Sequence, residues 1–185
     1  MSAAPLPPWP ADPPAHGAVV LRRWTDDDAE VVRDLSQDPY VPLITTIPAR
    51  ATTPQALAWV GRQRGRHAEG TGFSFAVAEA ATGAAVGQVG LWLAELPEGR
   101  ASAGYVIAPT ARGRGFARSA LLAVTAFAWT VPGLHRVQLF VEPSNEASVR
   151  TARGAGYEPE GLLRSYREIG GRRRDVLVFA AVRGG

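Results

Sequence analysis

The sequence predicts an α+β domain in which one mixed, mostly antiparallel sheet of seven strands is flanked by about four helices. Two observations predict this class. The expected elements follow the order strand, two helices, three strands, helix, strand, helix and two strands, which neither separates helices from strands nor alternates them regularly. The chain also has 185 residues, of which 46% are apolar, so it is large enough for one core and needs no second domain.

The first 17 residues predict a flexible, proline-rich arm, and residues 18–185 predict the folded domain. Residues 1–14 hold six of the fifteen prolines and show no periodic apolar pattern. The arm lacks the charged start and the apolar stretch of a signal peptide, and no run approaches about 18 apolar residues. A cytoplasmic protein without a membrane span is therefore expected.

Seven segments are rich in β-branched or aromatic residues and alternate well enough to predict strands. They are residues 18–21, 73–79, 85–94, 100–107, 136–141, 157–163 and 175–182. Thr82-Gly83 predicts a hairpin turn between the second and third strands, and the arginine-rich segment 170–174 predicts a turn between the last two.

Four segments carry helix signals, and they are residues 26–36, 53–67, 119–129 and 145–154. Thr25 precedes three aspartates and predicts an N-cap with acids in the first turn, and Thr53-Pro54 predicts the N-cap and first position of the second helix. Residues 38–52 contain three prolines and predict an irregular loop. Loops of this length usually have a function.

Composition excludes several kinds of chemistry. The chain has no cysteine, which removes disulfides, thiolate nucleophiles and cysteine-bound zinc, and its three scattered histidines do not predict a metal site. All 20 basic residues are arginine, so no lysine is available for Schiff-base chemistry. The net charge is only +3, and the arginines are spread along the chain without interleaved aromatics, so nucleic-acid binding is not expected.

The segment Arg112-Gly113-Arg114-Gly115-Phe116-Ala117 lies between a predicted strand and a predicted helix. Glycines can take positive φ and expose their N–H groups, and the start of a helix adds unpaired donors and a favourable dipole. A diphosphate is the natural ligand of such a turn. The segment lacks the Lys-Ser/Thr ending of a P-loop and the full spacing of a dinucleotide-binding loop.

The spacing Arg112-x-x-Gly115-x-Ala117 resembles the R/Q-x-x-G-x-G/A signature of the GCN5-related N-acetyltransferases (GNAT), which in that family cradles the pyrophosphate of acetyl-CoA. The predicted element order over residues 18–183 is similar to that fold as well. Within the family the chain most resembles the RimJ/RimL-type enzymes, which acetylate N-terminal amines of ribosomal proteins. The pairs Gly104-Tyr105 and Gly156-Tyr157 and the motif Asn145-x-x-Ser148 carry this likeness.

The resemblance implies acetyl-CoA as cofactor and a splay between the fourth and fifth strands, where an amide near Val106 or Ile107 polarises the acetyl carbonyl. The residues implied to hold the cofactor are Tyr105, Val106, Ile107, Arg112, Gly113, Arg114, Gly115, Phe116, Ala117, Asn145 and Ser148. Many relatives have a tyrosine seven residues after the asparagine to protonate the leaving thiolate. Ala152 stands there in this chain, and Ser148 is the substitute seen in some RimJ/RimL-like enzymes.

An acceptor amine also needs a base, because an alkyl amine with a pKa near ~10 is mostly protonated at neutral pH. Glu142, just past the fifth strand, and Glu79, at the end of the second, are the candidates; a solvated strand-end glutamate is the simpler interpretation of each. The chain offers no Cys or Lys to accept the acetyl group and no convincing Ser-His pair. Direct attack in a ternary complex is therefore expected.

Simpler roles stay open for other residues. Asn145 fits an N-cap, and Ser148 fits a first-turn hydroxyl bonded to backbone. Trp92 fits the core. Arg172, Arg173 and Arg174 predict a solvated hairpin tip, with contact to an acidic acceptor or to the 3′-phosphate of the cofactor as the alternative.

The leading hypothesis is an acetyl-CoA-dependent N-acetyltransferase acting on a protein or peptide N-terminus or on a small amine. An antibiotic-modifying N-acetyltransferase is the close alternative. A non-catalytic acyl-CoA-binding regulatory module is another, because Ala152 replaces the expected tyrosine, and a nucleic-acid- or ribosome-binding protein is a third. The sequence selects neither the acceptor nor the oligomeric state, for which a homodimer is one option.

Overall fold

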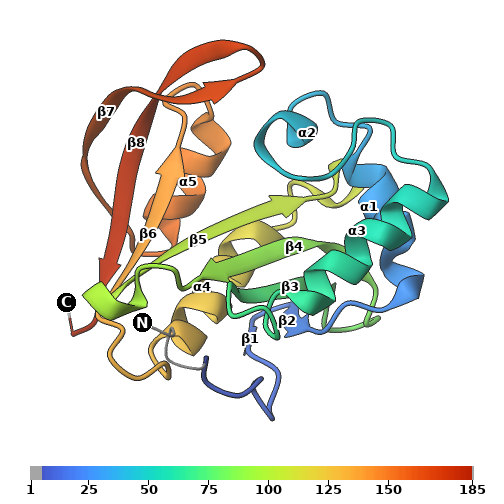
Figure 1. Cartoon of the computed structure of the whole chain (residues 1–185), viewed down its shortest axis with the longest axis horizontal. Coiled ribbons are helices and arrows are strands. Elements are labelled where there is room, and N and C mark those ends of the chain that lie inside the picture. Colours follow the sequence, from blue (N-terminus) through green and yellow to red (C-terminus); the bar gives the residue numbers. More distant parts are fainter. Residues whose placement is uncertain (1–5, 185) are drawn as a thin grey trace.

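The computed structural model describes residues 6–184 as one sheet of eight strands with helices on both faces (Figure 1). The strand order is β1-β2-β3-β4-β5-β6-β8-β7, and every neighbouring pair is antiparallel except β5 and β6. The predicted α+β class is confirmed. The eighth strand, β1, is a pair of residues at the end of the N-terminal segment.

The strands are β1 (Ala15–His16), β2 (Val19–Arg22), β3 (Gly72–Glu79), β4 (Ala85–Trp92), β5 (Arg100–Ile107), β6 (Arg136–Val141), β7 (Glu158–Ile169) and β8 (Arg172–Val182). The helices are α1 (Ala29–Leu35), α2 (Val41–Ile44), α3 (Thr53–Gly65), α4 (Phe116–Ala128) and α5 (Glu146–Gly154). Within residues 6–184, no helix combines the length and the apolar composition that crossing a membrane requires.

Two helix boundaries differ from the sequence prediction. The loop 38–52 contains the short helix α2, because one oxygen of Asp38 accepts hydrogen bonds from the amides of Tyr40 (2.7 Å) and Val41 (3.1 Å). Helix α4 begins at Phe116 rather than at residue 119, directly after Gly115, which has φ +79°. Both glycines of the anion-binding segment therefore lie at the helix start.

The C-terminal hairpin is longer than predicted. β7 and β8 have 12 and 11 residues, and the turn is only Gly170-Gly171, both with positive φ. Arg172 to Arg174 are therefore strand residues rather than turn residues. They directly follow the turn and are exposed, as expected of a solvated hairpin tip. β7 is an exposed edge strand, so segment 164–174 has no apolar alternation by which the longer hairpin could be predicted.

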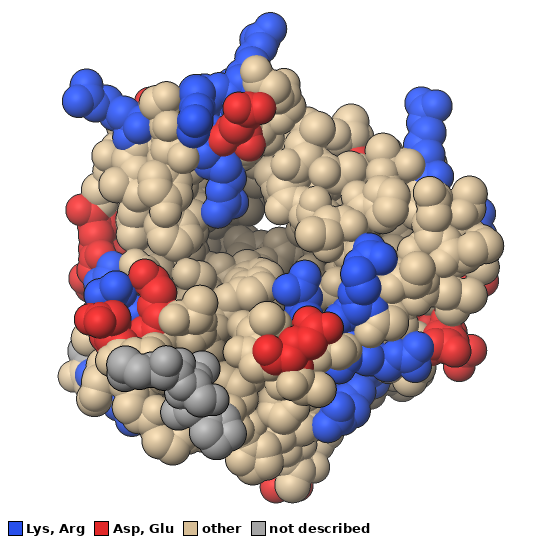
Figure 2. All heavy atoms as spheres, viewed as in Figure 1, with Lys and Arg blue, Asp and Glu red and all other residues tan. Residues whose placement is uncertain are grey.

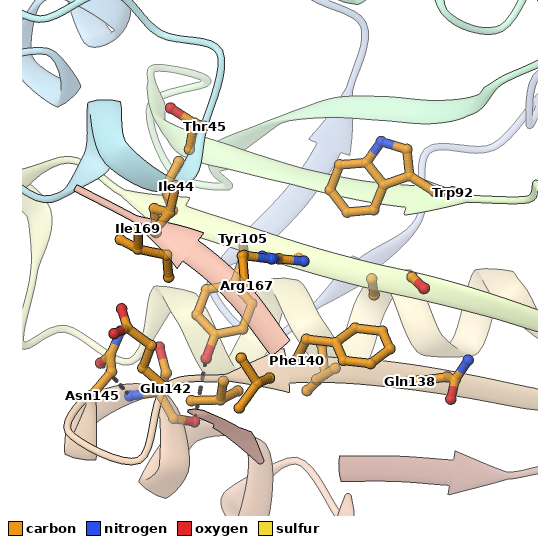
Figure 3. A pocket seen from close by; sticks show the side chains of 18 of the residues that line it. Ile44, Thr45, Trp92, Tyr105, Gln138, Phe140, Glu142, Asn145, Arg167 and Ile169 are labelled. Atoms are coloured by element: carbon orange, nitrogen blue, oxygen red, sulfur yellow. Dashed lines mark hydrogen bonds between the residues drawn. The ribbon is translucent and has the colours of Figure 1, made fainter. Parts of the chain in front are cut away.

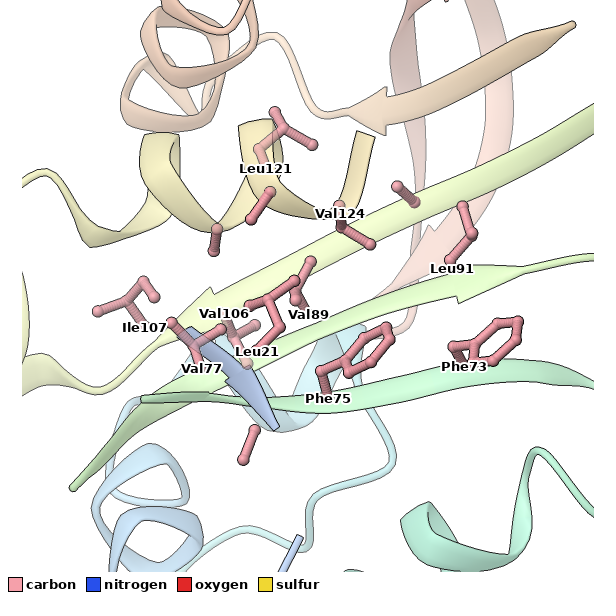
Figure 4. Close-up of a cluster of buried hydrophobic side chains, with 14 of the residues drawn as sticks. Leu21, Phe73, Phe75, Val77, Val89, Leu91, Val106, Ile107, Leu121 and Val124 are labelled. Carbon is pink, nitrogen blue, oxygen red and sulfur yellow. The ribbon is translucent and has the colours of Figure 1, made fainter. Parts of the chain in front are cut away.

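The central strands β3 and β4 have one apolar and one partly polar face. The first bears Phe73 and Phe75 (Figure 4). Both rings meet Phe127 of α4 edge to face, with ring centroids 4.8 and 5.6 Å apart. On the other, Ser74 donates a hydrogen bond to Gln63 of α3 at 3.1 Å. The sheet is thus a wall between α4 and the α1–α3 layer, and its polar face is available to line a site.

The N-terminal segment lies against the domain where the structure describes it. The Trp9 ring is 4.8 Å from that of Phe75, and the Arg23 guanidinium lies 4.2 Å above Trp9. Residues 1–5 of the predicted arm lie outside the described residues. The flexibility expected for residues 1–17 stays a prediction.

β5 and β6 are the fourth and fifth strands of the sequence prediction, and their splay is present. Their parallel ladder covers only residues 100–102 against 136–138. Beyond Ser102, β5 continues to pair with β4, while β6 pairs with β8 along its whole length. The two strands therefore diverge and leave an opening in the sheet.

Gly87 holds β4 close to β5, since it lies opposite Ile107, and a Cβ there would be 2.2 Å from the carbonyl oxygen of Val106. We expect Gly87→Ala to lower the free energy of unfolding by about 1–3 kcal/mol, because backbone must move. Gly61→Ala in α3 is the control, because its Cβ would meet nothing within 4 Å. The higher helix propensity of alanine should raise the free energy of unfolding of this variant by up to about 1 kcal/mol. Urea denaturation measures both, and equal changes would contradict the close approach.

Candidate active site

The divergence of β5 from β6 opens into two adjoining cavities, and Figure 2 shows a hollow in the middle of this face. One, of about 760 Å³, lies against the starts of α4 and α5. The other, of about 1070 Å³, lies between α2, α3 and the β7–β8 hairpin. The residues that line both are Tyr40, Ile44, Tyr105, Val106, Asn145 and Ser148. The cavities therefore meet at the splay.

The wall of the smaller cavity includes most of the predicted anion-binding segment. Gly113 and Gly115 both have φ +79°, and a Cβ on either would meet nothing within 4 Å, so it would occupy open space. No side chain caps α4, which leaves the first amides of that helix free to bind a ligand. This wall suits a diphosphate, because several N–H donors converge on it.

The two arginines of the segment are already engaged. Arg112 donates from Nε to the carbonyl oxygen of Ile107 (3.1 Å) and lies 2.7 Å from Asp38 Oδ2. Arg114 turns away from the cavity to form an ion pair with Glu79. Additional positive charge comes from Arg118 and Arg150, which line the cavity, and sequence reasoning missed both. The only sequence feature that could have indicated them is their position in the first turns of two helices, where Arg118 lies three residues after Gly115 and Arg150 three residues after Ala147.

Asp38 joins the cofactor segment to α2. One carboxylate oxygen caps α2 and the other contacts Arg112. Burial alone would raise the pKa of Asp38, but the bonds from the Tyr40 and Val41 amides and from Arg112 outweigh it and lower that pKa. The carboxylate therefore stays charged and holds the two segments together.

Asn145 and Ser148 lie together at the start of α5. The side-chain oxygen of Asn145 accepts a hydrogen bond from the amide of Ser148 at 3.1 Å, so Asn145 is an N-cap and also lines both cavities. Tyr105 donates a long hydrogen bond (3.5 Å) to the carbonyl oxygen of Ser148. Ala152 is fully buried in the same helix, so that position supplies no group to the cavities.

Glu142 lies at the end of β6 on the wall of the larger cavity and is only 8% exposed. Its carboxylate accepts a hydrogen bond from the hydroxyl of Tyr40 and lies 3.6 Å from Arg174 Nε. Burial raises the pKa of Tyr40, and the hydrogen bond to Glu142 raises it further, so the phenol keeps its proton. Sequence reasoning missed Tyr40, whose only signal was its place in the proline-rich loop.

The structure does not bring Glu79 to this group. Glu79 ends β3, where it pairs with Arg114 and accepts a hydrogen bond from Thr82 at 3.1 Å. It lines neither cavity. Trp92, which the sequence assigned to the core, does line the larger cavity.

Comparison with known proteins identifies the family. Residues 18–158 match the family model of the acetyltransferase (GNAT) domain. The chain belongs to the GNAT acetyltransferases. Its relatives include the "uncharacterized N-acetyltransferase p20" of Bacillus licheniformis, 28% identical over 165 residues that cover 89% of this chain and 93% of p20.

Solved structures agree with this assignment. RimJ of Mycobacterium smegmatis, in complex with CoA-disulfide, is 26% identical with a TM-score of 0.77, covering 93% of this chain and 85% of RimJ. The Microcin C7 self immunity acetyltransferase MccE, in complex with acetyl-CoA and AMP, shares the fold at 16% identity with a TM-score of 0.76. The match covers 89% of this chain and 92% of MccE. This GNAT protein is an acyltransferase, and its cofactor is acetyl-CoA.

The fit between the glycine segment and a diphosphate can be tested with Gly115→Val. We expect CoA affinity to fall at least about tenfold, because a side chain would occupy the cradle and strain a positive-φ residue. Gly83→Val is the control, since Gly83 also has positive φ and open space around it but lies in the β3–β4 turn. Calorimetry with CoA distinguishes the two, and equal losses of affinity would point to strain alone.

Burial also raises the pKa of Tyr105 and Tyr157, as it does for Tyr40. A phenol with an ordinary pKa near ~10 loses its proton in the unfolded chain at a lower pH than the buried phenol does in the folded protein. The contribution of each tyrosine to the free energy of unfolding is therefore fully present below pH ~10 and falls above it, by up to about 1.4 kcal/mol per pH unit. The chain has no lysine or cysteine to mask the effect. Urea denaturation between pH 9 and 11.5 should show this fall in the free energy of unfolding, and Tyr157→Phe should make its slope with pH less steep. A flat profile in the parent protein would contradict the burial of these hydroxyls.

Proposed function

We propose that this protein transfers an acetyl group from acetyl-CoA to a primary amine, at a protein or peptide N-terminus or on a small molecule, by direct attack in a ternary complex. The meeting of two cavities at Tyr105, Asn145 and Ser148 carries the proposal, because cofactor and amine can enter from opposite sides of the splay. The bound thioester supplies the acetyl group. An N–C bond forms as the C–S bond breaks, one proton leaves the amine, and one reaches the sulfur.

We assign this enzyme to the RimJ/RimL-like group and to the cytoplasm. The likeness to RimJ of Mycobacterium smegmatis supports the group, as does the motif Asn145-x-x-Ser148 at the start of α5.

Glu142 is our candidate for the base that takes the amine proton. Its carboxylate is buried on the wall of the larger cavity, which we take as the amine cavity. Tyr40 and Arg174 fix its position from two other segments of the chain. Glu79 has no part in this mechanism, because it lies away from both cavities.

The amide of Ile107 is our candidate for polarising the acetyl carbonyl. The amide of Ala108 donates to the carbonyl oxygen of Val86 on β4. Successive amides of a strand point to opposite edges, so the amide of Val106 faces β4, and those of Tyr105 and Ile107 face the opening toward β6. Of the two positions that the resemblance implied, Ile107 is therefore the better placed.

Ser148 is our candidate for protonating the leaving sulfur. Its residue lines both cavities, and its backbone is held at both ends, by Asn145 through the amide and by Tyr105 through the carbonyl. The hydroxyl therefore sits on a fixed turn of helix at the junction where the thioester is expected.

A non-catalytic acyl-CoA-binding module is the second candidate, since the buried Ala152 leaves α5 without the tyrosine of many relatives. Turnover decides between the two. Free thiol release from acetyl-CoA in the presence of primary amines is expected of the enzyme, and CoA binding without release would favour the binding module.

Substitutions test the residue roles. We expect Glu142→Gln to lower kcat/KM by about 10²- to 10⁴-fold and Ser148→Ala to lower kcat by about tenfold or more, with CoA affinity unchanged. Glu146→Gln is the matched control, because Glu146 is exposed on the same loop-to-helix junction and lines neither cavity. A parent-like rate in both Glu142→Gln and Ser148→Ala would overturn the roles but not the family.

A further inference from the structure

The acidic groups of the larger cavity are already paired. Its charged lining residues are Arg66, Arg100, Arg167, Glu95 and Glu142. Arg100 lies 3.2 Å from Glu95, and Glu142 is held by Tyr40 and Arg174. Arg167 has no carboxylate within 4 Å among residues 6–184. Arg66 has no such carboxylate either, but its Nε donates a hydrogen bond to Gln63 at 2.6 Å. Among the charged residues that line the cavity, Arg167 is thus the cation without a carboxylate or hydrogen-bond partner in the described part of the chain.

The β7–β8 ladder places Arg167 directly opposite Arg174. Directly opposed residues of an antiparallel pair project from the same face, and like charges in that arrangement destabilise a sheet. Glu142 is the one carboxylate that contacts this pair within the described residues, at 3.6 Å from Arg174. An anion beside Arg167 would relieve the repulsion that remains.

The local backbone is built to hold Arg167 in this position. The ladder shifts register between Leu163 and Arg167, and within the shift Ser165 has φ +52°, a conformation that non-glycine residues rarely adopt. The carboxylate of Asp175 accepts a hydrogen bond from the Ser165 amide at 2.8 Å and stabilises the bulge. Bulges commonly redirect a side chain beside a site.

Arg167 lies close to the proposed reaction centre. Its side chain lines the same cavity as Tyr105, Glu142 and Asn145, and Figure 3 labels these residues there. Its charge also acts on the hydroxyl of Tyr40, which donates to Glu142, and partly opposes the rise in the pKa of Tyr40. An anion bound to Arg167 and an amine at Glu142 could therefore belong to the same small molecule.

An apolar floor adjoins this charge. The Trp92 ring lies on Gly90 and Gly104, so closely that a Cβ on Gly90 would be 2.8 Å from the ring. Phe140 stacks on Tyr166 with ring centroids 5.6 Å apart, and both line the cavity with Trp92. An apolar or aromatic side chain of a substrate fits this floor.

We propose that the acceptor is an amine that carries a carboxylate within a few bonds of its nitrogen, as in an amino acid with an apolar side chain, and that Arg167 binds the carboxylate. This inference rests on the proposed function. It makes Arg167 a specificity-determining residue, and it disfavours polyamines and aminoglycosides, whose several positive charges Arg167 repels.

Matched acceptors test the inference. In the thiol-release assay we expect phenylalanine to have a kcat/KM at least about tenfold above that of phenethylamine, its decarboxylated counterpart, and spermidine to be a poor acceptor. Peptides that begin with Asp or Asn test a side-chain carboxylate in place of the α-carboxylate. Preference for the carboxylate in either pair supports the proposal. Equal rates within both pairs, or spermidine as the best acceptor, would overturn it.

Arg167→Gln should lower kcat/KM for the preferred carboxylate acceptor by about 10- to 100-fold and lower it at least about tenfold less for the uncharged partner of that acceptor. Arg164→Gln is the matched control, because it removes the same charge from the same strand at a residue that lines neither cavity. A similar loss with both members of a pair would show a structural role and contradict the inference.

Calorimetry separates this inference from the proposed function. Phenylalanine should bind the CoA-loaded parent protein and bind the Arg167→Gln variant at least about tenfold more weakly, whether or not acetyl transfer occurs. Absence of thiol release with every amine, alongside such binding, would contradict catalysis and leave the carboxylate site standing. Thiol release that ignores the carboxylate would contradict only the carboxylate site.

Discussion

The divergence of β5 from β6 is the constraint on which the rest of this structure depends. A parallel ladder that stops after three residue pairs leaves backbone amides of β5 without strand partners at the opening. The sheet tolerates this opening because β4 holds β5 on one side and β8 holds β6 along its whole length on the other. The opening is therefore bounded on both sides by hydrogen-bonded strands, and the two cavities meet at it.

The loop 38–52 couples the two cavities. Asp38 contacts Arg112 beside the glycine segment and caps α2, and two residues later Tyr40 donates to Glu142 in the amine cavity. Charge and direction are both fixed along this path, because Asp38 stays ionised and Tyr40 stays protonated. A pyrophosphate beside Arg112 would thus lie near Asp38, the carboxylate that caps α2 two residues before Tyr40.

The arginine-only composition gains meaning from the pairings that the fold creates. Of the arginines in the glycine segment, Arg114 is neutralised by Glu79 and Arg112 is shared with Asp38. The cofactor is therefore left with backbone amides, Arg118, and Arg150, which is paired only with the exposed Glu146 at 3.4 Å. In the amine cavity the carboxylates are paired, while Arg167 has no carboxylate within 4 Å in the part of the chain that the structure describes. The modest net charge of the chain does not reveal this distribution, since it depends on which residues the fold brings within 4 Å of one another.

The sequence by itself determined the α+β class, most strand and helix positions, the family and the anion-binding segment, because alternation, caps and glycines act through neighbours in the chain. It also placed Asn145 and Ser148 on one helix start, since the capping bond spans three residues. Only the tertiary structure decided which glutamate faces the amine cavity, that Tyr40 joins it, and that Arg167 stands opposite Arg174. Glu79 and Arg114 are 35 positions apart in the chain, and Tyr40 and Glu142 are 102 positions apart. The pairing of Arg167 with Arg174 depends on a register that a bulge sets. No local sequence pattern encodes the distance between such remote side chains.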